Sequence, residues 1–194
     1  RPKKYTKTTR AAAAIQNSLL SEADGIFVIY RNLAENESIS EFGFRLKQME
    51  GKSILKTAAI GVGSLGRHHA RNYAELAREG RVEFAGVCDA NAETARQIAA
   101  EYTTPSFTDW RELIGKADVV SIATPTETHR EIACAFLEKG THVLVEKPMA
   151  LSVAECDEMI AAAEKSGARL MVGQLERFNP AMVALRPHVT KPLY

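Results

Sequence analysis

The chain has 194 residues and a formal net charge of +1 at pH 7, so it has no overall field that would gather nucleic acid. Hydrophobic residues make up 45% and charged residues 25%, which is the balance of a soluble globular protein rather than a disordered or fibrous one. No apolar run approaches the ~20 residues that cross a bilayer. The three cysteines are scattered and outside any CxxC pattern, so they suggest neither a disulfide framework nor a metal site. We therefore expect a cytoplasmic protein.

Residues 1–55 do not share the rhythm of the rest of the chain. They begin with a basic run, Arg1 to Arg10, which is typical of a solvated terminal tail. Residues 32–43 are polar and show only weak periodicity. We interpret residues 1–55 as an N-terminal extension of unknown role, either poorly ordered or a small helical addition. The first residue is Arg rather than Met, which suggests a processed product or a fragment.

From residue 56 onward, short apolar runs alternate with longer segments of helical periodicity. This alternation predicts an α/β fold, a doubly wound parallel-sheet Rossmann domain over residues 56–174. The run at 119–123 is apolar and β-branched, which predicts a central strand covered on both faces. The predicted strands cover 57–60, 82–88, 106–107, 119–123, 142–145 and 169–172. The predicted helices cover about 64–78, 92–102, 109–114, 127–139 and 153–166.

Capping residues mark several of the predicted helix ends. Asp109 is placed to cap the brief helix that follows it, and Ser152 with Glu155 three residues later forms a capping-box pattern before 153–166. Gly140 and Gly167 follow two helices at positions where a left-handed residue commonly ends them.

The first predicted strand is joined to the first predicted helix by a GxGxxG motif, Gly61-Val62-Gly63-Ser64-Leu65-Gly66. Between a strand and a helix, this motif is typical of a dinucleotide-binding loop. Gly61 permits the tight turn, Gly63 lets a pyrophosphate approach the backbone, and Gly66 lets the helix and strand pack closely. The N–H groups at the start of the helix, near Ser64 and Leu65, would bind the anionic pyrophosphate.

Asp89 ends the second predicted strand, where an acidic residue accepts hydrogen bonds from the adenosine ribose. Its charge would repel a 2′-phosphate, and Ala90 and Asn91 offer no positive charge to neutralise one. We therefore predict NAD as the cofactor, with NADP less favoured. Arg96 is the main argument against this preference, because one helical turn could bring its positive charge near the position of a 2′-phosphate.

Two other interpretations of the glycine loop stay open. It could be a structural turn in an α/β domain that binds no nucleotide. It could also hold S-adenosylmethionine in a methyltransferase, although such enzymes usually carry an acidic residue on the preceding strand, where Ala58, Ala59 and Ile60 stand here.

The glycine loop, His69, Asp89, Thr124-Pro125 with His129, and Glu146-Lys147-Pro148 together resemble the glucose-fructose oxidoreductase and inositol dehydrogenase (Gfo/Idh/MocA) family over about residues 56–182. Members are similar in pairing a Rossmann domain with a C-terminal α/β domain on an open, mostly antiparallel sheet. The resemblance implies an NAD(P)-dependent oxidoreductase that transfers a hydride between a nicotinamide and the hydroxyl or carbonyl of a sugar, cyclitol or nucleotide sugar. It also implies a homo-oligomer for a full-length form.

The resemblance assigns the catalytic role to Lys147, which takes the proton of the substrate hydroxyl. The position agrees with the residue pattern, because open α/β sheets bind ligands past the carboxyl ends of their strands. The neighbouring Glu146 and Pro148 are implied to shape the loop and contact the cofactor. Two histidines, His69 and His129, fall near predicted helix starts, and we interpret them as packing or capping residues.

Thr124 and Pro125 are predicted to edge the nicotinamide-ribose pocket, because Pro125 fixes the loop just past the central strand. Family members often carry Asn two residues after the Thr, and Thr126 stands there in this chain. This departure puts the cofactor contact at Thr126 in doubt.

We interpret residues 175–194 as the start of a truncated C-terminal substrate domain. The segment 174–180 resembles members that act on nucleotide-activated amino sugars, such as UDP-N-acetylglucosamine 3-dehydrogenases, and Arg177 and Asn179 are candidate substrate contacts. The Asp and His that the family carries in its second domain would lie beyond Tyr194. The alternative function is therefore a non-catalytic module that binds a nicotinamide dinucleotide or senses redox state.

Overall fold

A computed structural model describes residues 54–174, together with residues 181 and 185. Nearly all of the predicted extension at 1–55 and of the predicted domain start at 175–194 lies outside the described residues. Residues 54–174 lie in one compact unit, which contains the sheet and its helices.

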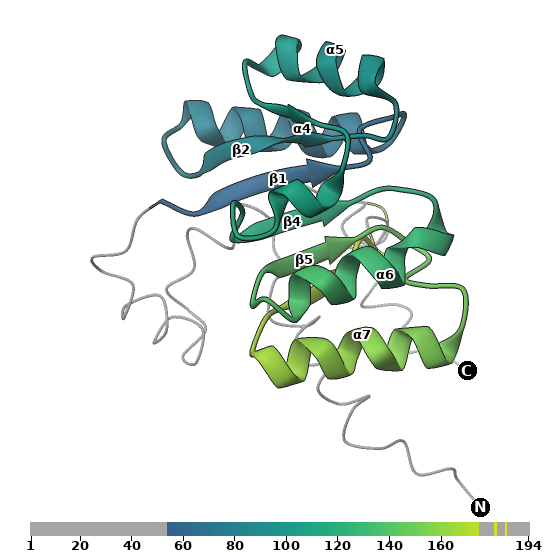
Figure 1. Cartoon of the computed structure of the whole chain (residues 1–194). Helices are drawn as coiled ribbons and strands as arrows, with labels where there is room; N and C mark the ends of the chain where they lie inside the picture. The colour runs from purple at the N-terminus through teal and green to yellow at the C-terminus, as the bar shows by residue number, and fades with distance from the viewer. Residues whose placement is uncertain (1–53, 175–180, 182–184, 186–194) are drawn as a thin grey trace, which may run out of the picture. The chain divides into compact units, whose positions relative to one another are not determined.

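The described part of the chain is built on one parallel sheet of six strands with the order β3-β2-β1-β4-β5-β6 (Figure 1). The chain runs outward from β1 through β2 to β3, then crosses to the other side of β1 to form the remaining strands. This reversal is the strand order of a Rossmann domain and confirms the predicted fold class. The strands are β1 (Lys56–Ile60), β2 (Glu83–Cys88), β3 (Ser106–Phe107), β4 (Val119–Ile122), β5 (His142–Val145) and β6 (Leu170–Val172).

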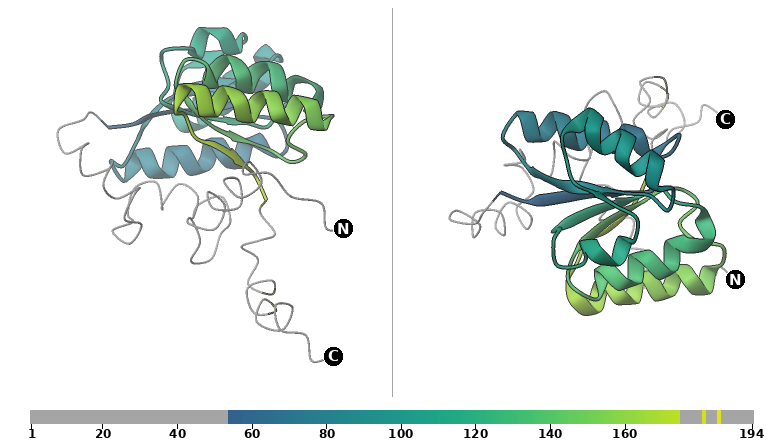
Figure 2. Two further views of the ribbon diagram at one scale, coloured as in Figure 1. Left: turned by 90° about the horizontal axis from the view of Figure 1, so that it is seen from below. Right: turned by 45° about the horizontal axis from the view of Figure 1, so that its top comes forward.

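Helices cover both faces of the sheet (Figure 2). Right-handed crossovers require this arrangement, because the chain moves in opposite directions from β1 in its two halves. One face carries α4 (Gly66–Arg78) and α5 (Ala92–Tyr102). The other carries α6 (Thr126–Leu137) and α7 (Val153–Ser166), with the short 3-10 helix η1 (Trp110–Leu113) leading into β4.

The predicted central strand is central in the structure. β4 lies between β1 and β5, and all four of its residues are buried, as expected for a strand with helices on both faces. Residues of β1, β4 and β5 share one apolar core with residues of α6 and α7. This core includes Ala58, Ile60, Val120, Ile122, Val143, Val145, Ile132, Phe136, Leu137 and Met159.

The predicted caps are confirmed. Asp109 accepts a hydrogen bond from the N–H of Arg111, and Ser152 with Glu155 forms the capping box of α7. Gly140 and Gly167 have φ of +81° and +74°, the left-handed conformation that ends a helix. Two predicted helix bounds differ by two residues: α4 begins at Gly66 rather than near residue 64, and α6 ends at Leu137 rather than near residue 139.

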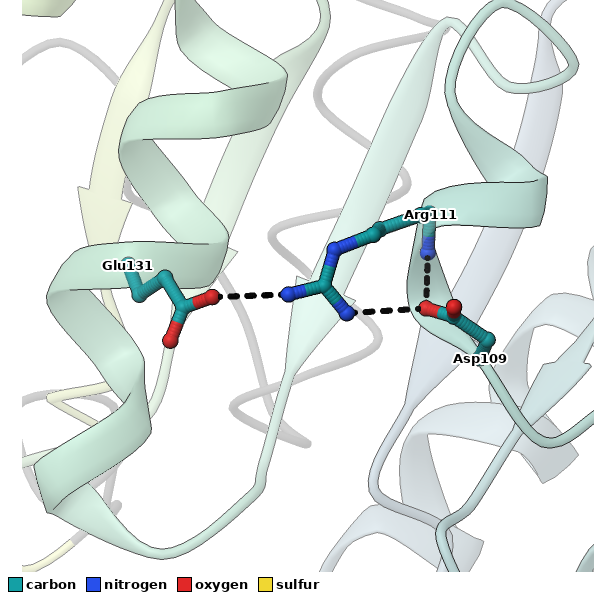
Figure 3. A network of polar contacts seen from close by, with 3 residues as sticks. All are labelled: Asp109, Arg111 and Glu131. Atoms are coloured by element: carbon teal, nitrogen blue, oxygen red, sulfur yellow. Dashed lines mark hydrogen bonds and ion pairs between the residues drawn. The ribbon is translucent and has the colours of Figure 1, made fainter.

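A surface network joins η1 to α6 (Figure 3). The Arg111 guanidinium donates to Asp109 at 3.2 Å and to Glu131 at 3.0 Å, and it lies over the ring of Trp110. The backbone and side-chain N–H groups of Arg111 hold the pKa of Asp109 below its usual value. All three charged side chains are exposed, so we expect this network to contribute little to stability.

His142, at the start of β5, is expected to make the stability of the fold depend on pH. Its Nδ1 accepts a hydrogen bond from the backbone N–H of Arg169 at 3.0 Å, which requires that nitrogen to be unprotonated. Burial, and then the charge of Arg169, lower the pKa of His142 below its ordinary value of 6.5, against a smaller opposing effect of Asp118. The unfolded chain therefore binds this proton more readily than the folded chain.

We expect the free energy of unfolding to fall as the pH drops through 6.5 toward the lower folded-state pKa of His142, and to be fully restored above 6.5. Urea denaturation at about pH 7.5 and about pH 5.5 measures the difference. His142→Asn is the control, because its amide oxygen can accept the same hydrogen bond and does not titrate. An equal fall in both proteins would show that other groups cause the pH dependence.

Candidate functional site

The carboxyl ends of the parallel strands bring the predicted site residues to one edge of the sheet. β1, β4 and β5 are adjacent in the sheet, so the loops that follow them are neighbours. Arg177 and Asn179, the predicted substrate contacts, lie outside the described residues. The residues brought together are Gly61, Gly63, Ser64, Leu65 and Gly66 after β1, Asp89 after β2, Thr124 and Pro125 after β4, and Glu146, Lys147 and Pro148 after β5.

The glycine loop packs tightly against the end of β4. Gly61 has a φ of +77°, and a Cβ placed on it would lie within 2.8 Å of the backbone of Ala123 and Thr124. A Cβ on Gly66 would collide with the backbone of Gly61. Both positions are therefore restricted to glycine, Gly61 by its left-handed turn and by the backbone after β4, and Gly66 by the close approach of the start of α4 to Gly61.

Gly63 is different, because it is exposed and a Cβ placed on it would have no neighbour within 4 Å. It lies three residues before Gly66, the first residue of α4, and this helix has no side-chain cap and no acidic residue in its first turn. By contrast, α5 and α7 are capped by Asn91 and Ser152, and α6, which also lacks a side-chain cap, has Glu127 in its first turn. The open space at Gly63 beside an uncapped helix start fits the pyrophosphate of a dinucleotide, whose oxygens would take the N–H groups of this turn.

Asp89 is fixed next to the glycine loop. Its Oδ2 accepts from the N–H of Val62 and its Oδ1 from the N–H of Asn91, both at 2.9 Å. Each oxygen keeps a lone pair for a further donor such as a ribose hydroxyl. Arg96, the reservation about the phosphate, is paired with Glu93 at 2.7 Å on the exposed side of α5.

Cys88 precedes Asp89 and is buried at the end of β2. Burial, and then the charge of Asp89, raise the pKa of the Cys88 thiol to about 12. The thiol is therefore neutral near pH 7 and unsuited to nucleophilic chemistry.

Glu146 points into the protein, away from solvent, and is 3% exposed. Its Oε1 accepts from His69 Nε2 at 3.0 Å, and its Oε2 accepts from the N–H of Lys147 at 3.2 Å. Burial alone would raise the pKa of Glu146, but the hydrogen bond and charge of His69, helped by Lys147, outweigh it and lower that pKa. Gly173, after β6, leaves the room for this carboxylate, since a Cβ there would lie 2.9 Å from Oε1.

Lys147 and Pro148 are exposed at the same edge, and the peptide bond between them is cis. The Lys147 ammonium is thus accessible to a bound ligand, whereas its backbone is held by Glu146. An amine in such a position can hold or move a proton at a bound ligand.

The Thr124-Pro125 loop is tied to the Lys147 loop by His129. His129 Nε2 is 2.9 Å from the carbonyl oxygen of Thr124, and its Nδ1 is 3.0 Å from that of Pro148. Sequence reasoning treated His129 and His69 as packing or capping residues, and both are buried, but each also contacts a site loop. A histidine at a buried position of a helix was the available signal, because a buried imidazole requires a polar partner.

In the part of the chain that the structure describes, no cluster of His, Cys, Asp or Glu could hold a metal ion. None of the described helices combines the length and apolar composition that a membrane span requires.

Residues 55–174 match the oxidoreductase family with an NAD-binding Rossmann fold. The UDP-N-acetylglucosamine 3-dehydrogenase of Acidithiobacillus ferrooxidans is 40% identical over 132 residues, which are 68% of this chain and 41% of that protein. The inositol 2-dehydrogenase of Salmonella paratyphi B is 32% identical over 68% of this chain and 40% of its own length. The chain thus spans about two fifths of the length of these relatives.

Solved structures of similar fold include two dehydrogenases of nucleotide-sugar chemistry. UDP-N-acetylglucosamine 3-dehydrogenase GnnA from Acidithiobacillus ferrooxidans superposes with a TM-score of 0.64 at 39% identity, covering 70% of this chain and 44% of that one. The WlbA dehydrogenase from Bordetella pertussis, in complex with NADH and UDP-GlcNAcA, has a TM-score of 0.64 at 25% identity. The match covers 71% of this chain and 42% of that one.

Proposed function

The chain belongs to the oxidoreductase family with an NAD-binding Rossmann fold, the Gfo/Idh/MocA family, and from this we propose that it forms the cofactor-binding part of an NAD-dependent dehydrogenase. The observation that carries the proposal is the open space at Gly63 before an uncapped helix, at the same sheet edge as the exposed Lys147. The substrate class is a sugar, cyclitol or nucleotide sugar.

We propose NAD rather than NADP. Asp89 presents a carboxylate where the adenosine ribose would lie, and its two backbone hydrogen bonds fix it there. A 2′-phosphate would lie against this negative charge. Arg96, the nearest candidate to neutralise such a phosphate in the sequence, is engaged by Glu93.

When bound, the nicotinamide supplies a hydride acceptor. Oxidation of a hydroxyl also releases a proton, and the neutral amine form of Lys147 takes it as the carbonyl forms, so that the side chain becomes an ammonium. Thr124 and Pro125 would border the nicotinamide side of the cofactor, since their loop follows the strand between those of Gly61 and Lys147. In the reverse reaction, Lys147 returns the proton to the carbonyl oxygen.

Gly63→Ala is expected to weaken NADH binding by about tenfold or more, because the new Cβ would occupy the space that the pyrophosphate needs. Titration of NADH fluorescence measures the dissociation constant. The melting temperature should hardly change, since nothing in the protein lies within 4 Å of that Cβ. Equal affinity of parent and variant would contradict the assignment of Gly63 to the cofactor.

As the finer proposal, we infer a nucleotide sugar such as UDP-N-acetylglucosamine as the substrate. The 40% identity to a protein of that activity supports it. NADH formation by the full chain with UDP-N-acetylglucosamine, myo-inositol and glucose 6-phosphate tests it. We expect kcat/KM to be highest for the nucleotide sugar, and a preference for free inositol would contradict it.

The same assay addresses the alternative, a dinucleotide-binding module without turnover. The two relatives of this chain named above are dehydrogenases, which favours the proposal that the chain is part of an enzyme. Tight NADH binding without turnover of any sugar, cyclitol or nucleotide sugar would instead support the module.

A further inference from the structure

Lys147 is exposed, but both of its chain neighbours are anchored to buried histidines from different helices. We propose that His69 of α4 and His129 of α6 are positioning residues, which hold Glu146 and Pro148 and thereby set the place of Lys147. This inference rests on the proposed function, in which Lys147 moves the substrate proton.

The anchor on the Glu146 side is a buried hydrogen-bonded pair. His69 is completely buried and Glu146 nearly so, and Nε2 donates to Oε1 at 3.0 Å. Because the carboxylate can only accept, the proton of this bond is on His69. The other carboxylate oxygen takes the N–H of Lys147, so the pair fixes the backbone from which the reactive side chain extends.

The anchor on the Pro148 side comes through α6, which covers the opposite face of the sheet from α4 (Figure 2). His129 is 1% exposed, and both of its ring nitrogens lie within 3.0 Å of carbonyl oxygens, those of Thr124 and Pro148. Carbonyl oxygens only accept, so a ring nitrogen bonds to one of them only when it carries a hydrogen: a neutral imidazole makes one of these two hydrogen bonds, and both form together when both nitrogens are protonated. His129 therefore ties the loop after β4 to the loop after β5.

The position of the backbone matters because the Lys147 side chain is long, and none of the contacts in the described part of the chain orients its ammonium. A proton-transfer group must lie within hydrogen-bond reach of the substrate oxygen. A shift of about 1 Å in a reacting group can cost roughly a hundredfold in rate. The two histidines restrict such a shift by holding the residues on either side.

Substitution of a histidine by Asn or Gln can place an amide N–H donor where one of the two ring nitrogens was. Counting bonds from Cβ, the amide nitrogen of Asn corresponds to Nδ1 of His, and that of Gln corresponds to Nε2. His69 reaches Glu146 through Nε2, so His69→Gln retains this donor and His69→Asn removes it. His129 reaches Pro148 through Nδ1, so His129→Asn retains that donor and His129→Gln keeps only the one to Thr124.

The Asn and Gln variants are therefore expected to rank in opposite order by kcat at the two positions, with Gln higher at His69 and Asn higher at His129. In the full chain, we expect kcat to be about tenfold or more lower for His69→Asn than for His69→Gln, and about tenfold or more lower for His129→Gln than for His129→Asn. The dissociation constant for NADH should differ by less than about threefold within each pair. A purely structural role predicts that kcat follows the melting temperature without this reversal.

Equal kcat values within the pairs, or Gln favoured at both positions, would overturn the proposal. Hydrogen exchange of the backbone amide of Lys147 gives a second readout that needs no turnover. It should be faster in His69→Asn and His129→Gln than in their paired variants, and equal rates would also overturn the proposal. If the parent chain oxidises no substrate, the proposed function fails while the exchange order still decides the positioning role.

Discussion

Replacing Lys147 with Ala is expected to lower kcat by roughly 10²–10⁴-fold while the dissociation constant for NADH changes by less than about threefold. The large effect on turnover follows because the side chain is exposed at the sheet edge, where its amine is the proton acceptor of the proposed reaction. The small effect on binding follows because the proposed cofactor contacts are made by Gly63, the start of α4 and Asp89. Steady-state NADH formation and NADH fluorescence titration measure the two quantities.

Two further variants separate proton transfer from charge. Lys147→Arg carries a permanent positive charge, and a guanidinium that stays protonated cannot accept the proton of the substrate hydroxyl, so we expect a loss of kcat similar to that of Lys147→Ala. Lys139→Ala, at an exposed lysine after α6, is the matched control and should turn over as the parent does. Turnover by Lys147→Ala equal to that of the parent would remove the catalytic assignment.

The fold could be predicted from the sequence because its signals are local. The bounds predicted for α5, β3, β5 and α7 are those observed, since caps such as Ser152 and left-handed glycines such as Gly167 mark helix ends directly. The start of α4 was less accurate. Its first turn has no capping side chain, so the sequence held no signal that separates the loop from the helix.

The sequence predicted that the candidate site residues lie together at one edge of the sheet, but not the contacts between them. The carboxyl edge of a parallel sheet is implied by the strand order, which explains why Gly63, Asp89 and Lys147 could be grouped. The direction of each side chain is not implied. Glu146 and Lys147 are adjacent in sequence, yet one is buried against α4 and the other is exposed.

The roles of the two histidines depended on contacts across long sequence separations. His69 meets a residue 77 positions away, and His129 meets one 19 positions away. Neither pairing follows from spacing or propensity, because both depend on how helices on the two faces pack against the sheet. Coordinates were needed to show that helix histidines and the Lys147 loop form one hydrogen-bonded unit.

Gly61→Ala is expected to destabilise the fold by roughly 2–5 kcal/mol, a large part of the ~5–15 kcal/mol that stabilises a typical domain. The left-handed φ of +77° costs about 1–2 kcal/mol for a residue with a Cβ. The remainder comes from overlap, because the Cβ would meet backbone atoms of Ala123 and Thr124 that cannot turn aside as a side chain would. Denaturant unfolding monitored by circular dichroism measures the loss.

Gly140→Ala is the matched control, since Gly140 has a similar φ of +81° but nothing within 4 Å of the added Cβ. It should cost only the strain, about 1–2 kcal/mol, and an equal loss in the two variants would show that crowding at Gly61 is not important. Gly61→Ala would also lose NADH affinity, but through unfolding of the loop. Gly63→Ala loses affinity with the fold intact, so only the comparison of stability with affinity shows which glycine contacts the cofactor.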